Sequence, residues 1–307
     1  MLPTDTNGPG SGAIVAGAAN EIVVDVARKA RTELGLNRAA AGAFDAVDTA
    51  IGSDAKLAAS IRGLYDGAAF RAAIDQMLPN YAGGVFEGVT LASRAAAAQV
   101  LEPQGSYTEE GDWGFWLSPF GWDASKAARE TTSYDVHGWG LGGGLERKTQ
   151  AGNFGVSLAY LHGRDSEGLA LNRVKHSQYE LAGFWRGHWG GLAAQLRGSA
   201  AFVSLDSIRQ FDGAVGSETV QRRAIADWNA MLYTGTGAIS YEQPVGQFSL
   251  RPAVRLDYAR LNEDAYRETG GGSARGDIRR LRGDQRVPVV VADRRVRRCL
   301  ACRLDPD

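Results

Sequence analysis

Few residues in this sequence have types and spacings that could do chemistry. Cys299 and Cys302 have the two-residue spacing of half a zinc or redox site, but no second cysteine pair accompanies them. Asp135 and His137 share one face of a predicted strand, where a carboxylate could orient an imidazole for acid–base catalysis. No Gly-x-Ser-x-Gly nucleophile motif accompanies them. We therefore expect no metal site, no cofactor and no enzymatic activity.

A glycine-rich stretch satisfies the dinucleotide-binding fingerprint only in its letters. Residues 138–143 read Gly-Trp-Gly-Leu-Gly-Gly, but a turn and another strand follow where that fingerprint needs a helix. Glycines in a strand also let a neighbouring group approach the backbone closely. The stretch therefore predicts close packing of neighbouring groups against the strand and not a cofactor site.

Positive charge is concentrated at the C-terminal end. Residues 275–307 hold ten arginines against five aspartates, whereas the whole chain has a net charge of −1. Such a tail could bind nucleic acid or anionic lipid, but charge runs are usually solvated, so we expect no nucleic-acid partner. The abrupt rise in arginine and the loss of aromatics instead suggest a frameshift or truncation near Ser273.

The element that positions most of the remaining charged residues is an alternating strand. Residues 248–258 place Leu250 and Val254 on one parity and Arg251 and Arg255 on the other. Because side chains of a strand point alternately to opposite faces, this strand has one apolar and one charged face. A soluble sandwich would bury the apolar face, whereas an outer-membrane barrel would turn it toward lipid and keep the charges in a wet interior.

The chain from Trp113 to Leu261 repeats this period in seven predicted strands. Short turns are expected at residues 151–153, 187–191 and 244–247, and longer polar loops at residues 123–133, 164–176 and 206–226. An up-and-down membrane barrel has this alternation of short periplasmic turns and longer external loops. We predict an all-β membrane barrel, built as an incomplete antiparallel meander and preceded by helices.

Two helical regions precede the strands. Residues 1–20 read as an irregular lead-in, and from about residue 20 to Leu78 apolar residues at three- and four-residue spacings predict short amphipathic helices. Residues 83–101 form an alanine-rich helix. That slim helix is either a packing or linker helix or one that fits inside something narrow, and composition does not separate the two.

Aromatic residues lie near the predicted strand ends, as the interface belts of a membrane barrel require. The candidate belt consists of Trp113, Trp122, Trp139, Tyr160, Trp185, Trp189, Tyr241 and Tyr258.

The sequence resembles the autotransporter β-domains of type V secretion. The resemblance covers roughly residues 60–272, and residues 134–147 and 154–160 resemble the second and third strands of that family. The most specific part is the block Glu268-Thr269-Gly270, at a fixed distance after the alternating strand.

This resemblance implies an outer-membrane barrel of about twelve strands with a helix threaded through its pore. It implies that the domain takes part in export of its own passenger, with outer-membrane lipid and the barrel-assembly machinery as further partners. The candidate pore-helix residues are Val85, Phe86, Val89, Arg94 and Gln99. The candidate lumen-facing residues are Arg186, Arg197, Arg251, Arg255 and Asp257.

The sequence departs from the family pattern after the Glu-Thr-Gly block, where family members continue with further strands. We therefore divide the chain into residues 1–57 (passenger remnant), 58–104 (helical junction and pore helix), 105–272 (barrel strands) and 273–307 (a tail unlike the family). The expected location is the outer membrane of a Gram-negative bacterium, although this sequence shows no signal peptide. The alternatives are a general porin-like barrel, which the alanine-rich helix argues against, and a soluble β-sandwich binding module.

Overall fold

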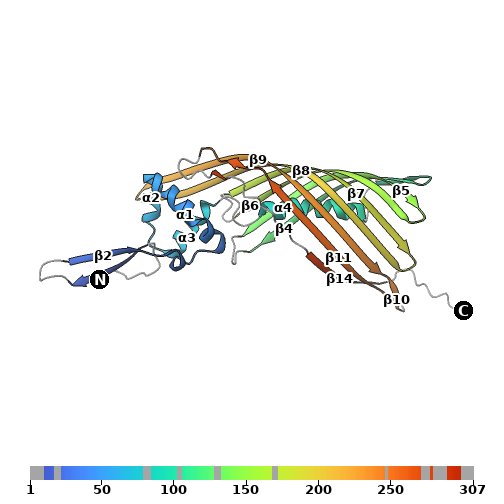
Figure 1. Cartoon of the computed structure of the whole chain (residues 1–307), viewed down its shortest axis with the longest axis horizontal. Helices are drawn as coiled ribbons and strands as arrows, with labels where there is room; N and C mark the ends of the chain where they lie inside the picture. Colours follow the sequence, from blue (N-terminus) through green and yellow to red (C-terminus); the bar gives the residue numbers. More distant parts are fainter. Residues whose placement is uncertain are drawn as a thin grey trace.

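The computed structural model is dominated by one curved antiparallel sheet, which holds a helix against its inner face (Figure 1). It describes residues 10–16, 22–78, 84–101, 106–127, 133–167, 172–245, 248–270, 277–278 and 289–298.

The strands of the large sheet follow one another in a meander. Their order is β14-β11-β9-β8-β7-β6-β5-β4-β3, with β10 continuing the β9–β11 hairpin. The seven long strands are β4 (Trp113–Lys126), β5 (Tyr134–Thr149), β6 (Gly152–Glu167), β7 (Asn172–Trp189), β8 (Leu192–Val215), β9 (Glu218–Tyr241) and β11 (Phe248–Glu263). The short ones are β3 (Ser106–Glu110), β10 (Gln243–Val245) and β14 (Val289–Arg298). Within the described residues the two edges, β3 and β14, do not pair, so the sheet is not closed. The seven-strand meander is confirmed, and the two-sheet sandwich is wrong.

The strands are longer than the sequence indicated. The β8–β9 ladder continues unbroken from Leu192↔Tyr241 to Val215↔Glu218, through the whole segment expected to be a polar loop at residues 206–226. The predicted loops at residues 123–133 and 164–176 are likewise partly strand. Backbone pairing does not depend on apolar side chains, so a hairpin can project beyond its apolar part as a ladder with polar faces.

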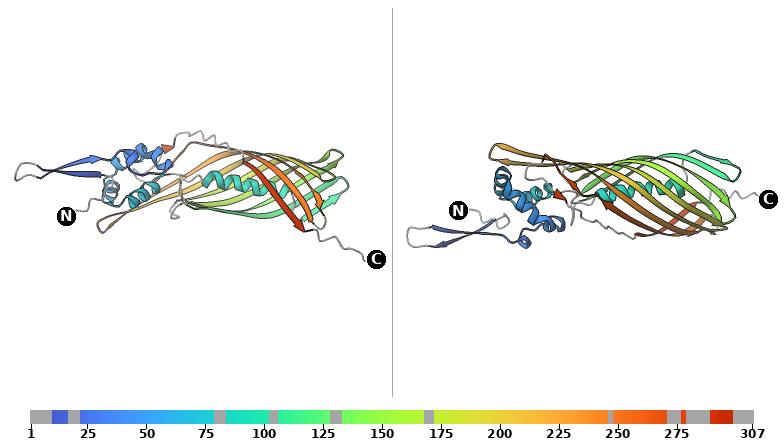
Figure 2. Two further views of the ribbon diagram at one scale, coloured as in Figure 1. Left: turned by 90° about the horizontal axis from the view of Figure 1, so that it is seen from below. Right: turned by 45° about the horizontal axis from the view of Figure 1, so that its top comes forward.

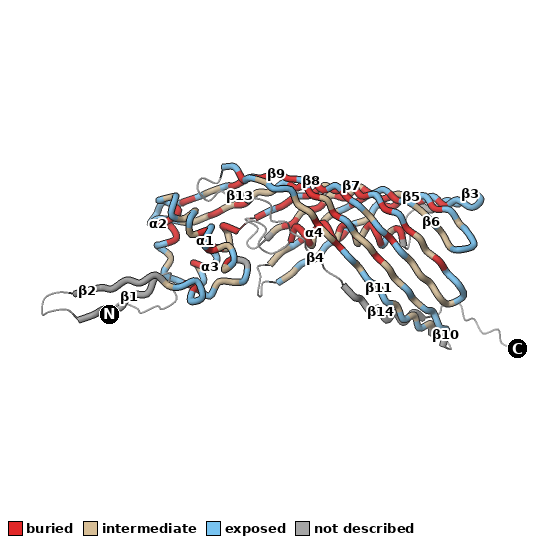
Figure 3. The backbone as a smooth tube through the Cα atoms, viewed as in Figure 1, coloured by how far each residue is buried: buried red, intermediate tan, exposed pale blue. Residues whose placement is uncertain are grey.

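Along each strand, successive residues alternate between more buried and more exposed, because they point to opposite faces of the sheet (Figure 3). On β11, Leu250, Val254 and Leu256 are exposed on the outer face, while Arg251 and Arg255 are half-buried on the inner face. The predicted separation into an apolar outer face and a charged inner face is therefore confirmed.

The N-terminal region contains a hairpin of β1 (Gly10–Ala16) and β2 (Ile22–Arg28) where an irregular lead-in and the start of a helix were expected. That prediction was wrong. Four of the first five residues of β2 are isoleucine or valine, and such β-branched residues favour strands over helices.

Three helices follow the hairpin, and each starts at a side-chain cap. They are α1 (Arg38–Ser53), α2 (Ala55–Arg62) and α3 (Gly67–Gln76), after a short 3₁₀ turn η1 (Arg31–Glu33). Asn37, Asp54 and Asp66 accept hydrogen bonds from backbone N–H groups in the first turn of α1, α2 and α3. Such caps satisfy donors that would otherwise have no partner, so the sequence fixes where each helix begins.

The three helices form a unit against the far tip of the β8–β9 hairpin (Figure 1). Phe44, Leu57 and Ile74 bury their side chains together with Phe211 of β8 and Val220 of β9. The hydrophobic effect therefore holds this helical unit on the part of the hairpin that projects past the other strands.

The tail after Ser273 was predicted to lie outside the barrel strands. It instead contributes β14, whose backbone pairs with β11 from Phe248↔Arg298 to Asp257↔Val289, and a two-residue strand, β13 (Asp277–Ile278), that pairs with β12 (Tyr266–Arg267). Residues 289–291 are three consecutive valines, which favour a strand.

Candidate functional site

The candidate site is the inner face of the sheet together with α4 (Gly84–Leu101), which runs along it in both views of Figure 2. The N-terminal end of α4 lies by the last residues of β6, where Asp165 approaches Gly84, and its last turn packs against Trp116 and Phe184 near the short turns. We call these the loop end and the turn end of the sheet. The helix therefore connects the two ends through the interior.

One part of the inner face, which we call the aromatic arc, combines aromatic rings on β4 with glycines on β5. Trp116, Phe120 and Trp122 of β4 lie over the inward-facing Gly144, Gly140 and Gly138. A methyl group at Gly138 would lie 2.3 Å from the Trp122 ring and 2.6 Å from the carbonyl oxygen of His162. Only glycine leaves room for these rings, so the sequence motif serves packing, as expected.

The helix presents small side chains to the aromatic arc. Ala92 and Ala96 are buried against Trp122 and Leu161, with exposed fractions of 0% and 3%. Glycines in the wall and alanines on the helix together allow a bulky aromatic layer to fit between the two backbones.

The side chains in the loop-end half of α4 are larger and more apolar than the alanines that face the aromatic arc. Val85, Phe86 and Val89 pack in one cluster with Val203 of β8 and Leu232 of β9. This apolar contact fixes the depth of the helix in the interior, because sliding would expose valine and phenylalanine.

Polar contacts between α4 and the strands occur at two further positions of the helix. The hydroxyl of Ser118 donates to Oε1 of Gln99 at 2.9 Å, and the hydroxyls of Ser93 and Thr234 are 3.4 Å apart. Arg94 and Glu87 are paired at 4.0 Å on the less buried side of the helix.

The other part of the inner face, the charged arc, carries ion pairs close to the turn end. Arg197 pairs with Glu180, and both side chains are almost fully buried. Arg186 pairs with Glu146, whose side chain is also buried. Each of these guanidinium groups thus has a carboxylate partner, which an ion needs when it is removed from water.

Arg251, Arg255 and Asp257 complete the charged arc on β11. Nε of Arg255 is 2.9 Å from Oδ2 of Asp257, and Thr236 donates to the same carboxylate at 2.7 Å. Arg251 donates to the hydroxyl of Ser240 at 3.1 Å. The structure therefore places all five candidate lumen residues on the inner face.

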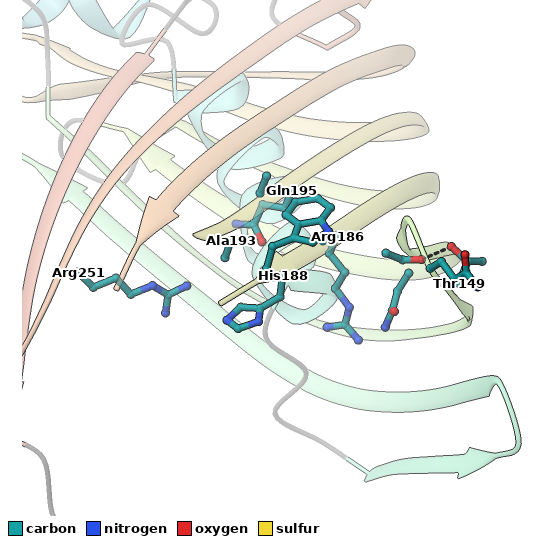
Figure 4. Close-up of a pocket in the computed structure, with 12 residues that line it drawn as sticks. Thr149, Arg186, His188, Ala193, Gln195 and Arg251 are labelled. Carbon is teal, nitrogen blue, oxygen red and sulfur yellow. Dashed lines mark hydrogen bonds between the residues drawn. The ribbon is translucent and has the colours of Figure 1, made fainter. Parts of the chain in front are cut away.

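A cavity of about 390 Å³ opens at the turn end of the charged arc (Figure 4). Arg186 and Gln195 line it from β7 and β8, and Arg251 lines it from β11. Asn153 and His188 also reach its wall. The mouth on this side is polar and carries arginines.

The loop end is held together by a buried ion pair. Nε of Arg209 on β8 donates to Oε1 of Glu268 at 3.1 Å, and Nη1 reaches the carbonyl oxygen of Gln76 at 3.4 Å. Glu268 belongs to the Glu-Thr-Gly block, and the neighbouring Thr269 exchanges backbone hydrogen bonds with Ile225 of β9. That block therefore joins the segment after β11 to the projecting hairpin.

The sequence matches the autotransporter β-domain family over residues 115–285, which is more than half of the chain. The chain belongs to the autotransporter β-domain family. Among solved structures it is similar to the translocator domain of the autotransporter NalP from Neisseria meningitidis, with 15% identity, 69% of this chain and 67% of that chain covered, and a TM-score of 0.41. A search of curated proteins returns no match.

As an autotransporter β-domain, the chain is an outer-membrane barrel component of type V secretion in Gram-negative bacteria. The family match extends to residue 285, thirteen residues past the boundary of 272 expected from the family resemblance. No helix in the described part of the chain is both long and apolar enough to cross a membrane.

Seven of the eight belt candidates lie on the outer face of this autotransporter domain, and Trp122 does not. Trp122 is only 8% exposed and stacks on His176 inside the sheet. The strand parity of β4 decides this, because Trp113 and Trp122 are nine residues apart and must face opposite sides. Its assignment to the belt was wrong.

The outer aromatics occupy two levels. On β7, Tyr179 packs on Tyr160 with ring centroids 5.1 Å apart, and Trp189 packs on Trp185 at 5.8 Å. Ten residues separate Tyr179 from Trp189, which is about 33 Å along a strand and roughly 24 Å along the membrane normal at a 45° tilt. This separation matches the apolar band of an outer-membrane barrel.

Glu146, Glu180 and Arg209 were not among the predicted site residues, although parity could have indicated them. Glu180 shares the inward parity of Arg186, and Arg209 that of Arg197. Of the chemical candidates, Asp135 and His137 lie 3.8 Å apart on the outer face, and Cys299 and Cys302 lie outside the described residues.

Proposed function

We propose that this domain takes part in the export of its own N-terminal passenger, with α4 as the segment that stays in the lumen after export. The observation that carries the proposal is the position of α4, whose first turns pack on β8 and β9 toward the loop end and whose last turn packs near the short turns at the other end. Short turns face the periplasm and longer hairpins face outward in outer-membrane barrels. The helical unit of residues 31–78 would then lie outside the cell.

The lining of the interior supports this role. The guanidinium groups of Arg251 and Arg255 would stay hydrated in the lumen, where they can contact a polar chain in transit. The barrel-assembly machinery is the expected partner for insertion, because an open row of strand edges is costly in lipid. We further propose residues 1–57 as passenger remnant, residues 58–104 as junction and pore helix, and the tail as a segment outside the family pattern.

A cysteine pair tests whether α4 occupies the lumen in cells. Cysteines at Gln99 and Ser118, with both native cysteines replaced by serine, should be joined by a short bifunctional thiol cross-linker in intact cells, because the two native side chains are in contact. The matched control combines the same helix cysteine with one at Leu117, which is 55% exposed on the outer face. Equal cross-linking of both pairs, or of neither, would contradict the proposed position.

Surface proteolysis tests the direction of export. Trypsin added to intact cells should cut at Arg62, an exposed residue of the helical unit. Cleavage that requires prior permeabilisation of the outer membrane would place this unit in the periplasm and reject the proposal.

A further inference from the structure

The outer face of β6 and β7 changes character step by step from the turn end to the loop end. Directly opposite residues on the two strands are Leu158↔Leu181, then Tyr160↔Tyr179, then His162↔Ser177, then Arg164↔Lys175. The series passes from apolar to aromatic to polar to cationic on one continuous surface. This is the order in which a membrane passes from hydrocarbon to interface to charged headgroup.

Two cations facing each other in this series are unfavourable without an anion. Arg164 and Lys175 are register partners with side chains on the same face, and like charges directly opposite each other destabilise a sheet. Arg173 adds a third cation on that face, two residues beyond Lys175. Across the described residues, none of the three has an ion-pair partner within 4.0 Å. We call these three residues the outer cationic cluster.

Acidic groups on the neighbouring strands flank the outer cationic cluster. Asp206 on β8 is the register partner of Lys175 on its other side, but no ion pair joins the two. Asp135 on β5 lies 3.8 Å from His137, which is itself the register partner of Arg164. The outer faces of β6 and β7 therefore carry the three cations, whereas the outer-face carboxylates Asp123, Asp135, Asp206 and Asp227 lie on the strands to either side.

The aromatic pair sets the height of the cluster in the membrane. Arg164 and Lys175 each lie four residues beyond Tyr160 and Tyr179, which is about 13 Å along a strand and roughly 9 Å along the normal at a 45° tilt. The cluster thus lies just outside the aromatic level, where lipid phosphates are found. In the other direction, the outer surface of β6 and β7 ends on the aromatic pair Phe154 and Trp185, with ring centroids 6.5 Å apart, so these two strands are aromatic at the turn end and cationic at the loop end.

We propose that Arg164, Arg173 and Lys175 bind the phosphate groups of lipid A, the phosphorylated glycolipid of the outer leaflet. Guanidinium and ammonium groups form charge-assisted hydrogen bonds with phosphate, and an anion between Arg164 and Lys175 removes their repulsion. The assignment of this rim to the outer leaflet rests on the proposed function, which places the loop end outside. The site gives the domain a specific contact with one leaflet.

The test compares two lipids on the folded, detergent-solubilised full chain. Native mass spectrometry measures binding of diphosphorylated lipid A and of the same lipid without its phosphates. Each cation near an anionic headgroup strengthens binding by about five-fold. Because the factors for the three cations multiply, we expect a preference of about 100-fold for the phosphorylated lipid. Equal binding of the two lipids would overturn the proposal without the need for any variant.

The variant carries Arg164→Gln, Arg173→Gln and Lys175→Gln, and it should lose this preference. Arg147→Gln is the matched control, because Arg147 is an exposed outer-face cation at the turn end, 5.7 Å from the Trp113 ring centroid. An equal loss in the control, or inorganic phosphate competing as strongly as lipid A, would overturn the proposal. If lipid preference survives while trypsin fails to reach Arg62 on intact cells, the direction of export is wrong and the phosphate site stands.

Discussion

The aromatic arc and the charged arc line the same interior but are held together by different physics. In the aromatic arc, rings such as Trp122 occupy the space left by Gly138, so shape decides which residues fit. In the charged arc, Arg197 and Glu180 are removed from water together, so mutual neutralisation decides. One wall of a lumen can therefore hold its helix by close packing while another wall stays polar.

Breaking a buried pair should give the largest effect. Glu180→Gln keeps the shape of the side chain but leaves the buried Arg197 without a counter-charge, which should cost about 3–5 kcal/mol of unfolding free energy. Urea unfolding followed by tryptophan fluorescence measures it. The double variant Glu180→Gln with Arg197→Met should recover most of the loss. A single variant as stable as the wild type would mean that the pair is solvated.

Filling a glycine of the aromatic arc should come next. Gly138→Val places its Cβ against the Trp122 ring and the backbone of β6, and such overpacking costs about 1–3 kcal/mol. The matched control is Gly183→Val on the outer face of β7, where no atom lies within 4 Å of the added Cβ. Heat-dependent gel mobility and urea unfolding should separate the two variants. Equal behaviour would show that the arc repacks freely.

The same ion-pair chemistry should matter less outside the lumen. Arg222 on the projecting hairpin is 2.9 Å from Asp54, and this guanidinium holds the pKa of Asp54 below its usual range. Asp54→Asn keeps a good N-cap for α2 but removes the charge, so docking of the helical unit should weaken by about 1 kcal/mol. Hydrogen exchange of α1–α3 measures it. Unchanged protection would show that apolar packing alone holds the unit.

Acid should affect that docking only at low pH. Since the folded-state pKa of Asp54 is depressed, its contribution is present above the unfolded value and is lost as pH falls through the folded value. Exchange protection should therefore be constant from pH 7 to 5 and fall below about pH 4, where aspartates take up protons. A loss already at pH 6 would implicate another group.

The smallest effect is expected for an exposed pair. Lys56 pairs with Glu218 at the hairpin tip, but both side chains are more than half exposed. Water and salt screen such pairs, so Lys56→Gln should leave exchange protection of the helical unit unchanged. A clear loss would show that the hairpin tip is less solvated than its exposure indicates.

The sequence correctly predicted which face of the sheet a side chain occupies wherever strand parity determines that face. Alternation at residues 248–258 placed Arg251 and Arg255 inside, and alanine content identified α4. Partners across strands were not predictable, because pairing Arg197 with Glu180 requires the register of β7 against β8. Docking of α1–α3 was missed because residues 206–226 read as a polar loop. The assignment of Trp122 to the aromatic belt was wrong because it rested on the position of this residue near a strand end, whereas strand parity decides which face it occupies.

The length of α4 has a consequence of its own. Its 18 residues rise about 27 Å, close to the hydrocarbon thickness of a bilayer. A helix also has a rotational phase, so one inserted residue would turn everything beyond it by about 100°. Such an insertion between Gly88 and Ala92 would swing Ala92 and Ala96 away from the aromatic rings. The junction is therefore a fixed spacer in both length and angle, and whole helical turns should be tolerated better than single residues.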